Sequence, residues 1–494
     1  MHAAFPIFIF DIEGRNEKMG KGLEEQEAII VVDLSNGDSG KGTTTESVAQ
    51  KKRAHTVIRF NGGAQAGHTV VTSDGRRHTF SQFSSATFIP GVETHLSRFM
   101  ILSPFALLEE EEHLRRNGMD DAFTRMTISE EALVITPFHS AANRLRELAR
   151  GNGRHGSCGV GVGETVSDSI QFPKEAIHAK DFRHKDILTR KLRAIQSRKR
   201  EELKDAIDFS RKNPIAEYEI KILEMSNVVN VIAERFVALA EQVRIIEDGY
   251  LSKILRRPGC VVFEGAQGVL LDEWRGFHPY TTWSTCTFDN ANELLSEHGY
   301  TGSIFKLGVV RAYATRHGPG PFVTEDIELT RFLPDSINTM NQWQREFRVG
   351  WFDIPATRYA IEACGGVDAL AVTCLDRLKD IQEWNVCTSY RIPEVDRVHA
   401  KDFFNLTTDS EHLVSGIKLG PWQDLEYQSF LTEHLMQAKP VYEISTNSVD
   451  VHERYRQHLN RLSRELGVPI AISSQGSRAK DKTHWLSRSS QYAL

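Results

Sequence analysis

The chain has 494 residues, of which 40% are apolar and 26% charged, and a formal net charge of −6 at pH 7. These values describe a globular protein that is long enough to bury a sizeable core. The negative charge disfavours general binding of nucleic acid, and no apolar run has the length of a membrane span, so we expect neither as a partner. The six scattered cysteines form no CxxC pair, which predicts reduced thiols and a cytoplasmic location.

Apolar, β-branched runs that alternate with charged helical segments predict an α/β protein with a large, mostly parallel central sheet flanked by helices. The runs expected to form buried strands are 29–32, 56–59, 99–102, 133–136, 261–263, 304–310, 369–373 and 470–472. Residues 176–257 instead predict a helical subdomain, and residues 380–445 a mixed β-rich region. We interpret residues 1–28 as an N-terminal extension and residues 29–494 as one domain that includes the helical subdomain.

The run GDSGKG, residues 37–42, follows the first of these strands and precedes a helical segment. Backbone N–H groups and the helix dipole favour an anion at such a place, and Lys41 adds a positive charge. The spacing excludes an ordinary P-loop, because only Asp38 and Ser39 separate the first two glycines and Gly42 follows the lysine. A carboxylate there would repel a phosphate, so Asp38 is predicted to hold a metal or to remove a proton. The alternative is a glycine turn with a surface lysine.

Two further glycine-rich stretches follow along the chain. In NGGAQAGHT, residues 61–69, His68 lies within a glycine loop, where an acid–base role is more plausible than on an apolar helix face. In HGSCGVGVGETVSD, residues 155–168, Ser157, Cys158 and neighbouring amides predict a second anion site. No base is assigned to Cys158, so we interpret it as a small polar residue rather than a nucleophile.

The segment FEGAQGVLLDEWRGFHPYTTWST, residues 263–285, combines an amide with a cluster of hydroxyls. The amide of Gln267 can donate and accept hydrogen bonds, which suits the edge of a purine base. Thr282 and the hydroxyls around it could bind a phosphate. The alternative is that the segment is a turn without a binding role, in which Trp274 and Trp283 fill the core.

Charged residues near the C-terminal half predict two more binding elements. Arg316, on a Gly/Pro-rich loop, and Arg345 and Arg348 could clamp a carboxylate or a phosphate with their guanidinium forks. Asp376 follows a predicted strand and could accept two hydrogen bonds from guanine. The segment SSQGSRAKDK, residues 473–482, could close over the ribose or the phosphates of a nucleotide.

Taken together and in order, these motifs resemble those of the adenylosuccinate synthetase family, over about residues 29–482. The matching segments are GDSGKGT, GGAQAGHT, FEGAQGVLLD, AYATRHGPGPFVTE, RVGWFD and TCLD. The resemblance implies a carbon–nitrogen ligase of purine nucleotide biosynthesis. Such an enzyme joins L-aspartate to C6 of a 6-oxopurine nucleotide such as IMP through a 6-phosphoryl intermediate. It uses GTP and Mg²⁺ and works as a cytoplasmic homodimer.

The resemblance also implies roles for individual residues. Asp38 would be the base and, with Gly67, a ligand of Mg²⁺; His68 would be the acid and Lys41 would hold the transferring phosphates. The other implied nucleotide-phosphate contacts are Gly37, Ser39, Gly40, Gly42, Thr43, Gly67 and Thr69. The implied purine-substrate contacts are Gln65, Ser157, Cys158, Gln267 and Thr282, and those of the nucleobase of the triphosphate are Asp376, Ser474 and Gly476.

Several positions depart from the family pattern. The lysine of the family motif TKxD is Cys374 here, which admits ATP as well as GTP as the energy source, and Phe347 stands at a position that is usually basic. The segments HGSCG, LLDEW and HPYTTWST resemble a divergent branch, the 2-aminoadenylosuccinate synthetases, which use GMP or dGMP. IMP and (d)GMP therefore both remain open as substrates. A ligase with another amine donor and a non-catalytic nucleotide sensor of the same fold are the alternatives.

Overall fold

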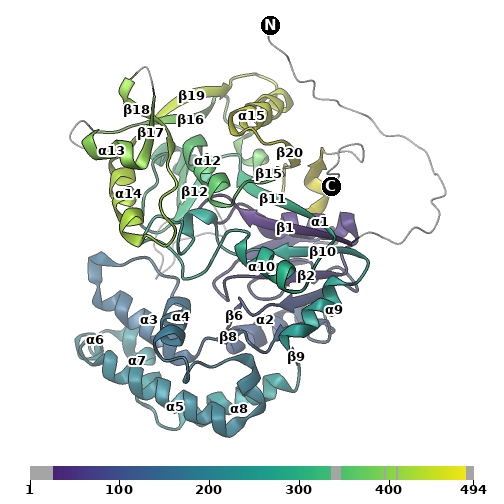
Figure 1. Cartoon of the computed structure of the whole chain (residues 1–494), viewed down its shortest axis with the longest axis vertical. Helices are drawn as coiled ribbons and strands as arrows, with labels where there is room; N and C mark the ends of the chain where they lie inside the picture. Colours follow the sequence, from purple (N-terminus) through teal and green to yellow (C-terminus); the bar gives the residue numbers. More distant parts are fainter. Residues whose placement is uncertain (1–25, 335–346, 394–396, 408–409, 486–494) are drawn as a thin grey trace, which may run out of the picture.

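The computed structural model describes residues 26–334, 347–393, 397–407 and 410–485, and it confirms the predicted α/β class. A ten-stranded sheet crosses the molecule in the order β21-β20-β15-β11-β1-β10-β2-β5-β7-β9 (Figure 1). Its strands pair in parallel except β21, which runs antiparallel to β20. In that order they are β21 (Lys482–His484), β20 (Ile470–Ser474), β15 (Ala369–Thr373), β11 (Ser303–Arg311), β1 (Gln26–Asp33), β10 (Gly259–Glu264), β2 (Thr56–Arg59), β5 (Glu93–Leu96), β7 (Met126–Ser129) and β9 (Arg244–Ile246).

The central strands are apolar on both faces because helices cover both sides of the sheet. In β1, Ile30 and Val32 join a core that includes residues of several helices, whereas Ile29 and Val31 join a core with α1 on the opposite face. This alternation is the period of two expected of a strand. The helices near the sheet are α1 (Lys41–Lys52), α2 (Pro104–Arg116), α9 (Leu251–Leu255), α10 (Asp289–Glu297), α11 (Ile327–Phe332), α12 (Ile354–Ala363) and α15 (Val451–Leu466).

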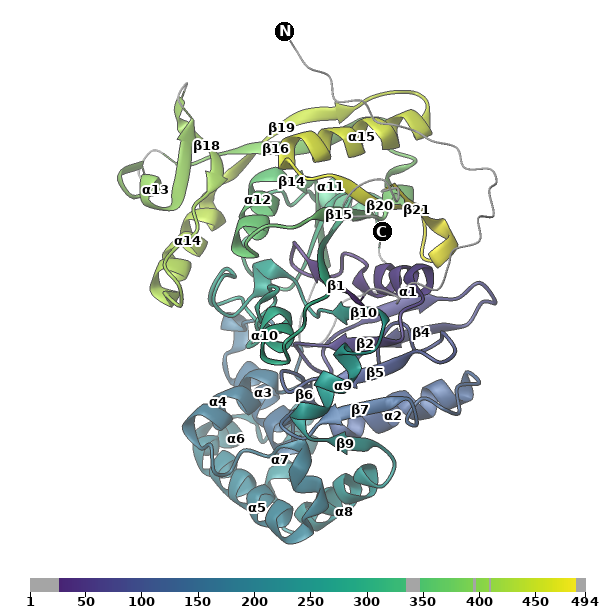
Figure 2. The same cartoon turned by 45° about the vertical axis from the view of Figure 1, so that its right-hand side comes forward.

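The segment predicted to be helical gathers at one end of the molecule, below the sheet in Figures 1 and 2. Within residues 176–257 lie α5 (Lys185–Glu202), α6 (Lys204–Ser210), α7 (Glu217–Glu224) and α8 (Val228–Ala240). Two helices before that segment, α3 (Pro137–Ala149) and α4 (Val162–Gln171), lie in the same region. The helices α3 and α5 to α8 share one apolar core with β5, β7 and α2. The same segment also supplies β9, the edge strand of the central sheet, which the sequence reading did not anticipate.

The predicted mixed β-rich region lies at the opposite end of the molecule (Figure 1). A five-stranded sheet there consists of β14 (Phe352–Asp353), β16 (Trp384–Arg391), β17 (Phe404–Thr407), β18 (Ser410–Ile417) and β19 (Lys439–Thr446). The helices α13 (Arg397–Phe403) and α14 (Leu425–Gln437) belong to the same region. Among all the helices described, none is both long and apolar enough to cross a membrane.

Two predicted strands were placed in the wrong sheet. Residues 99–102 and 133–136 contribute only β6 (Ile101–Leu102) and β8 (Leu133–Val134), which pair with each other apart from the main sheet. The main sheet instead uses β5, β7 and β9, whose polar side chains hide them from an apolar-run criterion; His95 in β5, for example, is fully buried. The chain also enters β1 at Gln26, slightly before the expected start at residue 29. Two antiparallel pairs complete the fold: the hairpin of β3 (His68–Val71) and β4 (Arg77–Phe80), and the two-stranded sheet of β12 (Ala314–His317) and β13 (Phe347–Gly350).

Candidate active site

The loop between β1 and α1 forms a tight turn at the carboxyl edge of the sheet, where parallel α/β sheets bind ligands. Gly37, Asp38 and Gly40 all have positive φ angles, of 89°, 59° and 82°. Such a backbone suits glycine, whereas at Asp38 it is sparsely populated and marks a constrained position. Gly40 is the N-cap of α1, so the first amides of the helix face the loop, at the place where the sequence predicts a phosphate cradle.

A carboxylate that the sequence reading did not single out holds this cradle together. Asp33, the last residue of β1, accepts hydrogen bonds from the backbone N–H of Ser35 and of Ser39, both at 2.9 Å. The Lys41 ammonium donates to Asp33 Oδ2 at 2.9 Å, and both side chains are almost fully buried. Thr373 at the end of β15 donates to the carbonyl of Ser39 at 2.7 Å. The lysine is therefore fixed in place at the cradle rather than exposed on the surface.

Asp38 lies within reach of two basic side chains. His317 Nε2 is 3.3 Å from Asp38 Oδ2, and the Arg311 guanidinium donates to the backbone carbonyl of Asp38. Burial raises the pKa of the Asp38 carboxyl, but His317, Arg311 and Lys41 outweigh this effect and hold the pKa below its ordinary value. Asp38 is therefore ionised at neutral pH and able to accept a proton or bind a cation.

His68 begins β3 and packs directly against the start of α1. A Cβ atom on Gly42 would lie 2.7 Å from the Cβ of His68, so only glycine permits this approach. His68 Nδ1 is 2.6 Å from Glu264 Oε1, at the end of β10, and Glu264 also accepts hydrogen bonds from the backbone N–H and the hydroxyl of Ser85. The imidazole is thus oriented by a buried carboxylate, beside the phosphate cradle.

The electrostatics of this pair favour an ionised Glu264. Burial would raise the pKa of Glu264, but His68, Arg59 and the Ser85 hydrogen bond hold it below its usual value. Burial, together with the charges of Arg59 and Lys41, holds the pKa of His68 below its ordinary value against the opposing effect of Glu264. We therefore assign the proton on Nδ1 to His68, with Glu264 as the acceptor, which leaves Nε2 to face a ligand.

Two buried amides have no hydrogen-bond partner among the described residues. Both polar atoms of Gln65 and of Gln267 are enclosed and unsatisfied. Gln267 has a positive φ of 55°, and a Cβ atom on Gly62 would lie 2.7 Å from its Oε1. A Cβ atom on Gly63 would lie 3.0 Å from Gln65 Oε1, so both amides lie against the same stretch of backbone. Unsatisfied buried polar groups cost about 1–3 kcal/mol each, which points to a polar ligand at this place.

The hydroxyl cluster and the second glycine-rich loop also meet near this backbone. Ser284 Oγ accepts a hydrogen bond from the N–H of Gly62 at 2.9 Å, whereas Thr282 is half-buried in the same loop. A Cβ atom on Gly163 would lie 2.8 Å from Trp283, and one on Gly156 would lie 2.5 Å from Pro319. The loop that carries Ser157 and Cys158 therefore packs between the Thr282 loop and the Arg316 loop. Ser157 donates to Asn143 at 2.7 Å, and burial raises the pKa of the Cys158 thiol, as expected for a residue that is not a nucleophile.

The structure describes two of the three arginines that were predicted to clamp an anion. Arg316 is buried and donates to the side chain of Asn36 in the cradle loop; burial and the charge of Arg348 lower its pKa to about 9. Arg348 donates to Glu325 at 2.8 Å and to the carbonyl of Gly318 at 2.6 Å. Arg345 lies outside the described residues. Arg316 thus contacts the cradle loop, whereas Arg348 donates its hydrogen bonds to the segment that follows β12.

A second cluster joins the first turn of α1 to the C-terminal segment of the sheet (Figure 2). Thr43 donates to the carbonyl of Ser477 at 2.8 Å, and the buried ammonium of Lys482 donates to Thr43 Oγ1. Burial lowers the pKa of Lys482 to about 8, against the raising effect of Glu46, Asp481, Cys374 and Asp376. The remaining predicted nucleobase contacts belong to the same edge: Ser474 ends β20 and donates to the carbonyl of Gly476 at 2.8 Å, and Asp376 follows β15.

The other predicted phosphate contact on β3 faces outward. The Thr69 hydroxyl pairs across the hairpin with that of Thr79 at 2.9 Å, and Gly67 is exposed. Both residues adjoin His68, but the Thr69 hydroxyl is engaged across the hairpin by Thr79.

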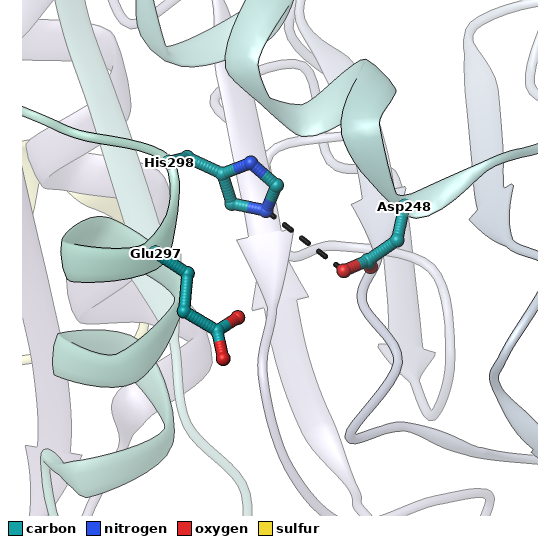
Figure 3. A group of neighbouring side chains, drawn as sticks. All are labelled: Asp248, Glu297 and His298. Carbon is teal, nitrogen blue, oxygen red and sulfur yellow. Dashed lines mark ion pairs between the residues drawn. The ribbon is translucent and has the colours of Figure 1, made fainter.

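One group of side chains away from the cradle has the composition of a metal site. Asp248, Glu297 and His298 bring their ligand atoms within 4.8 Å of one another, and Figure 3 shows His298 pointing at Asp248. The guanidinium of Arg98 already binds Asp248 at 2.9 Å and Glu297 at 2.6 Å. Because Arg98 supplies the positive charge that these carboxylates require, we interpret the group as an ion-pair network.

A parallel sheet with a phosphate cradle, an oriented imidazole and an ionised carboxylate at its carboxyl edge defines a nucleotide-binding α/β enzyme. The family model for adenylosuccinate synthetase matches residues 30–483. The chain therefore belongs to the adenylosuccinate synthetase family and is a carbon–nitrogen ligase, as the sequence motifs predicted.

Relatives and solved structures agree with this assignment. The chain is 28% identical over 459 residues to adenylosuccinate synthetase of Neisseria meningitidis serogroup C, which covers 91% of this chain and 96% of the relative. It is 32% identical over 377 residues to that of Mycobacterium leprae, with coverages of 75% and 82%. Fully ligated adenylosuccinate synthetase from Plasmodium falciparum has a TM-score of 0.70 at 19% identity, over 94% of this chain and all of that one. Cyanophage S-2L succinoaminodeoxyadenylate synthetase, bound to dGMP and dATP, has a TM-score of 0.55 at 15% identity, with coverages of 94% and 97%.

Three site residues escaped the sequence reading: Asp33, Glu264 and His317. Asp33 and Glu264 are the last residues of the apolar strands β1 and β10, so both lie at the carboxyl edge of the sheet. An acidic residue as the last member of a buried strand was the signal that could have identified them. His317 left no comparable signal, because only the pairing of β12 with β13 brings it to Asp38.

Proposed function

We propose that the protein joins L-aspartate to C6 of a 6-oxopurine nucleotide, IMP or (d)GMP, with GTP or ATP as the phosphoryl donor. The observation that carries this proposal is that Asp38 and His68 adjoin the same turn: Asp38 lies in the loop that leads into α1 at Lys41, and His68 packs against Gly42 in the first turn of that helix. A proton acceptor, an imidazole and a phosphate cradle in one place are what phosphorylation of a purine oxygen requires.

The first step activates the oxygen at C6, which is otherwise a poor leaving group. Asp38 removes the proton from N1, and O6 attacks the γ-phosphorus of the triphosphate. The bond between that phosphorus and the bridging oxygen breaks, so that the nucleoside diphosphate leaves and the purine carries a 6-phosphoryl group. Lys41 and the first amides of α1 hold the phosphoryl group during its transfer.

His68 stabilises the charge that develops on O6. In the ligand-free protein Lys41 and Arg59 oppose a positive charge on the imidazole. A triphosphate in the cradle would bring negative charge next to His68 and thereby raise its pKa. Glu264, which accepts from Nδ1, supports the imidazolium that forms, and Nε2–H then donates to O6.

In the second step the amine of aspartate attacks C6. The bond between C6 and O6 breaks, phosphate departs with the oxygen, and the amine nitrogen loses a proton. The amides of Gln65 and Gln267 would hold the purine edge, which satisfies their buried polar atoms, and Thr282 would contact the 5′-phosphate. Arg316, with Arg345 and Arg348, would bind the aspartate carboxylates or the phosphate.

The implied Mg²⁺ fits the residues at the cradle. Asp38 is ionised, and within the described residues the side-chain contact of its carboxylate is the ion pair of Oδ2 with His317. The two lone pairs of Oδ1 therefore remain, one for the ion and one for the proton of N1. Asp38 and Gly67 would hold the ion, which supplies charge neutralisation to the transferring phosphates. Asp376, Ser474 and Gly476 would receive the base of the triphosphate.

The experiment is a product assay on the purified full chain. IMP, GMP and dGMP are each incubated with aspartate, Mg²⁺ and either GTP or ATP, and a succinylated nucleotide is sought by mass spectrometry. We expect succinylated product with at least one pair of nucleotides, from a protein whose native mass is that of a homodimer. Nucleotide binding without product in any mixture would favour the sensor. Phosphate release that depends on an amino acid other than aspartate would indicate another amine donor.

A further inference from the structure

The two-stranded sheet of β12 and β13 contacts the cradle loop at two points. Arg316 and His317, consecutive residues at the end of β12, contact Asn36 and Asp38 respectively. His317 lies opposite Phe347 in the antiparallel pairing, with ring centroids 4.7 Å apart. The imidazole is thus supported by packing on one side while its Nε2 faces the carboxylate of Asp38.

The backbone and the side chain of Asp38 are held by different residues. Arg311 donates to the backbone carbonyl, which supports the left-handed conformation. That contact leaves the carboxylate free to rotate, because the χ2 torsion of aspartate is broad rather than confined to staggered wells. Across the described parts of the chain, the ion-pair contact of Asp38 Oδ2 with His317 Nε2, at 3.3 Å, is the side-chain contact that limits this rotation.

We propose that His317 is a positioning residue for Asp38. Nε2–H donates to Oδ2 and thereby turns Oδ1 toward N1 of the bound purine. This inference rests on the proposed function, in which Asp38 is the base. The physical gain is orientation: a catalytic group must be held within a narrow range of geometry, and a displacement of about 1 Å can cost about 10²-fold in rate.

Among the residues that the structure describes, the other cationic side chains near the pair make their hydrogen bonds elsewhere. The Lys41 ammonium is bound to Asp33, and the Arg316 guanidinium to Asn36 and to the carbonyls of Pro319 and Tyr280. Arg311 acts on the Asp38 carboxyl through its charge, and its guanidinium donates to the Asp38 backbone carbonyl and to the Tyr313 hydroxyl. His317 is therefore the residue whose removal should release the carboxylate.

The test compares three variants in the product assay. His317→Phe keeps a ring against Phe347 but removes the donor; His317→Gln keeps an N–H donor at nearly the same reach; Phe347→Leu weakens the ring packing and leaves the donor in place. We expect His317→Phe to lower kcat by about 10- to 10²-fold with less than about a threefold change in either nucleotide KM. We expect His317→Gln to recover most of the loss, and Phe347→Leu to lower kcat by less than about threefold.

Two further measurements separate positioning from a purely structural role. In the Asp38→Asn background, His317→Phe should cause no additional loss, because His317 acts only through the carboxylate. In the unsubstituted protein the Nε2 proton of His317 should give a downfield NMR signal that Asp38→Asn shifts or removes. This signal does not require turnover, so it reports the contact even if the assay of the unsubstituted chain detects no product.

The outcomes distinguish the positioning role of His317 from the proposed ligase activity on which it rests. An unsubstituted chain without ligase activity would overturn the proposed function. An active chain in which His317→Phe retains full kcat, or in which His317→Gln is as impaired as His317→Phe, would overturn the positioning role alone. If His317→Phe does not fold, as judged by thermal unfolding, the NMR signal and the His317→Gln rate decide the question.

Discussion

The carboxyl edge of the central sheet and the helical region α3–α8 both bury charged side chains. They differ in how completely the buried polar groups around those charges are hydrogen-bonded. In the helical region Lys199 is almost fully buried and donates to Glu164, Asp168 and Glu202 at 2.6–3.1 Å. At the sheet edge Lys41 is equally buried with Asp33, yet the amides nearby lack partners among the described residues. The first arrangement is complete without a ligand, and the second is not. This difference indicates which buried charges serve stability and which serve binding.

The largest expected effect is on Asp38, because the proposed mechanism assigns the removal of the N1 proton to its carboxylate. Asp38→Ala should lower kcat by about 10³- to 10⁴-fold, near the upper end for a positioned base. Affinity for the purine nucleotide, measured by calorimetry, should change little. A rate close to that of the unsubstituted chain would refute the role of Asp38 as the base. It would also remove the reason to regard the buried charges at the sheet edge as functional.

The helical region should respond in stability rather than in rate. Lys199→Met leaves the buried carboxylate of Asp168 without its closest ammonium and should lower the free energy of unfolding by about 3–5 kcal/mol in urea titrations. The control is Lys185→Met, which breaks the exposed pair with Glu234 and should cost less than about 1 kcal/mol. Equal losses in the two variants would show that burial does not distinguish these ion pairs.

A smaller loss is expected at the imidazole. His68→Asn should lower kcat by about 10²-fold, because the group that stabilises charge on O6 is lost while the cradle remains. Glu264→Gln keeps the hydrogen bond to His68 but removes the negative charge next to the imidazole. Its kcat should lie between the kcat of His68→Asn and that of the unsubstituted chain. A change of only a few-fold in both would mean that the His68–Glu264 pair is structural, like those of the helical region.

The smallest effect concerns pH and Glu46, which lies on α1 near Lys482. Burial raises the pKa of Glu46 from 4.5 to about 7 against the lowering effect of Lys482. Between these values the folded protein binds more protons than the unfolded chain, so this residue lowers stability as the pH rises from 4.5 to 7. Glu46→Gln removes that loss and should be more stable, relative to the unsubstituted chain, at pH 8 than at pH 5. Urea titrations at both pH values would show no such pH dependence if Glu46 were ionised throughout.

The sequence predicted the strands and the cradle well where the signal was local. The run 56–59 matches β2 and 369–373 matches β15, because uninterrupted apolar residues between polar segments leave few alternatives. The glycines and the lysine of the cradle were recognised for the same reason. Contacts that depend on tertiary structure were not: Glu264 meets His68, and His317 meets Asp38, across long separations in the chain. The polar strand β5 was missed because burial of His95 follows from its neighbours and not from its own hydropathy.

The most direct test of the central claim is an experimental structure of the protein with a 6-oxopurine nucleotide and a non-hydrolysable triphosphate. We expect Asp38 Oδ1 within about 3 Å of purine N1 and His68 Nε2 at a similar distance from O6, with the γ-phosphate held by the first turn of α1. A purine bound elsewhere, or contacted by only one of these two side chains, would contradict the proposed mechanism.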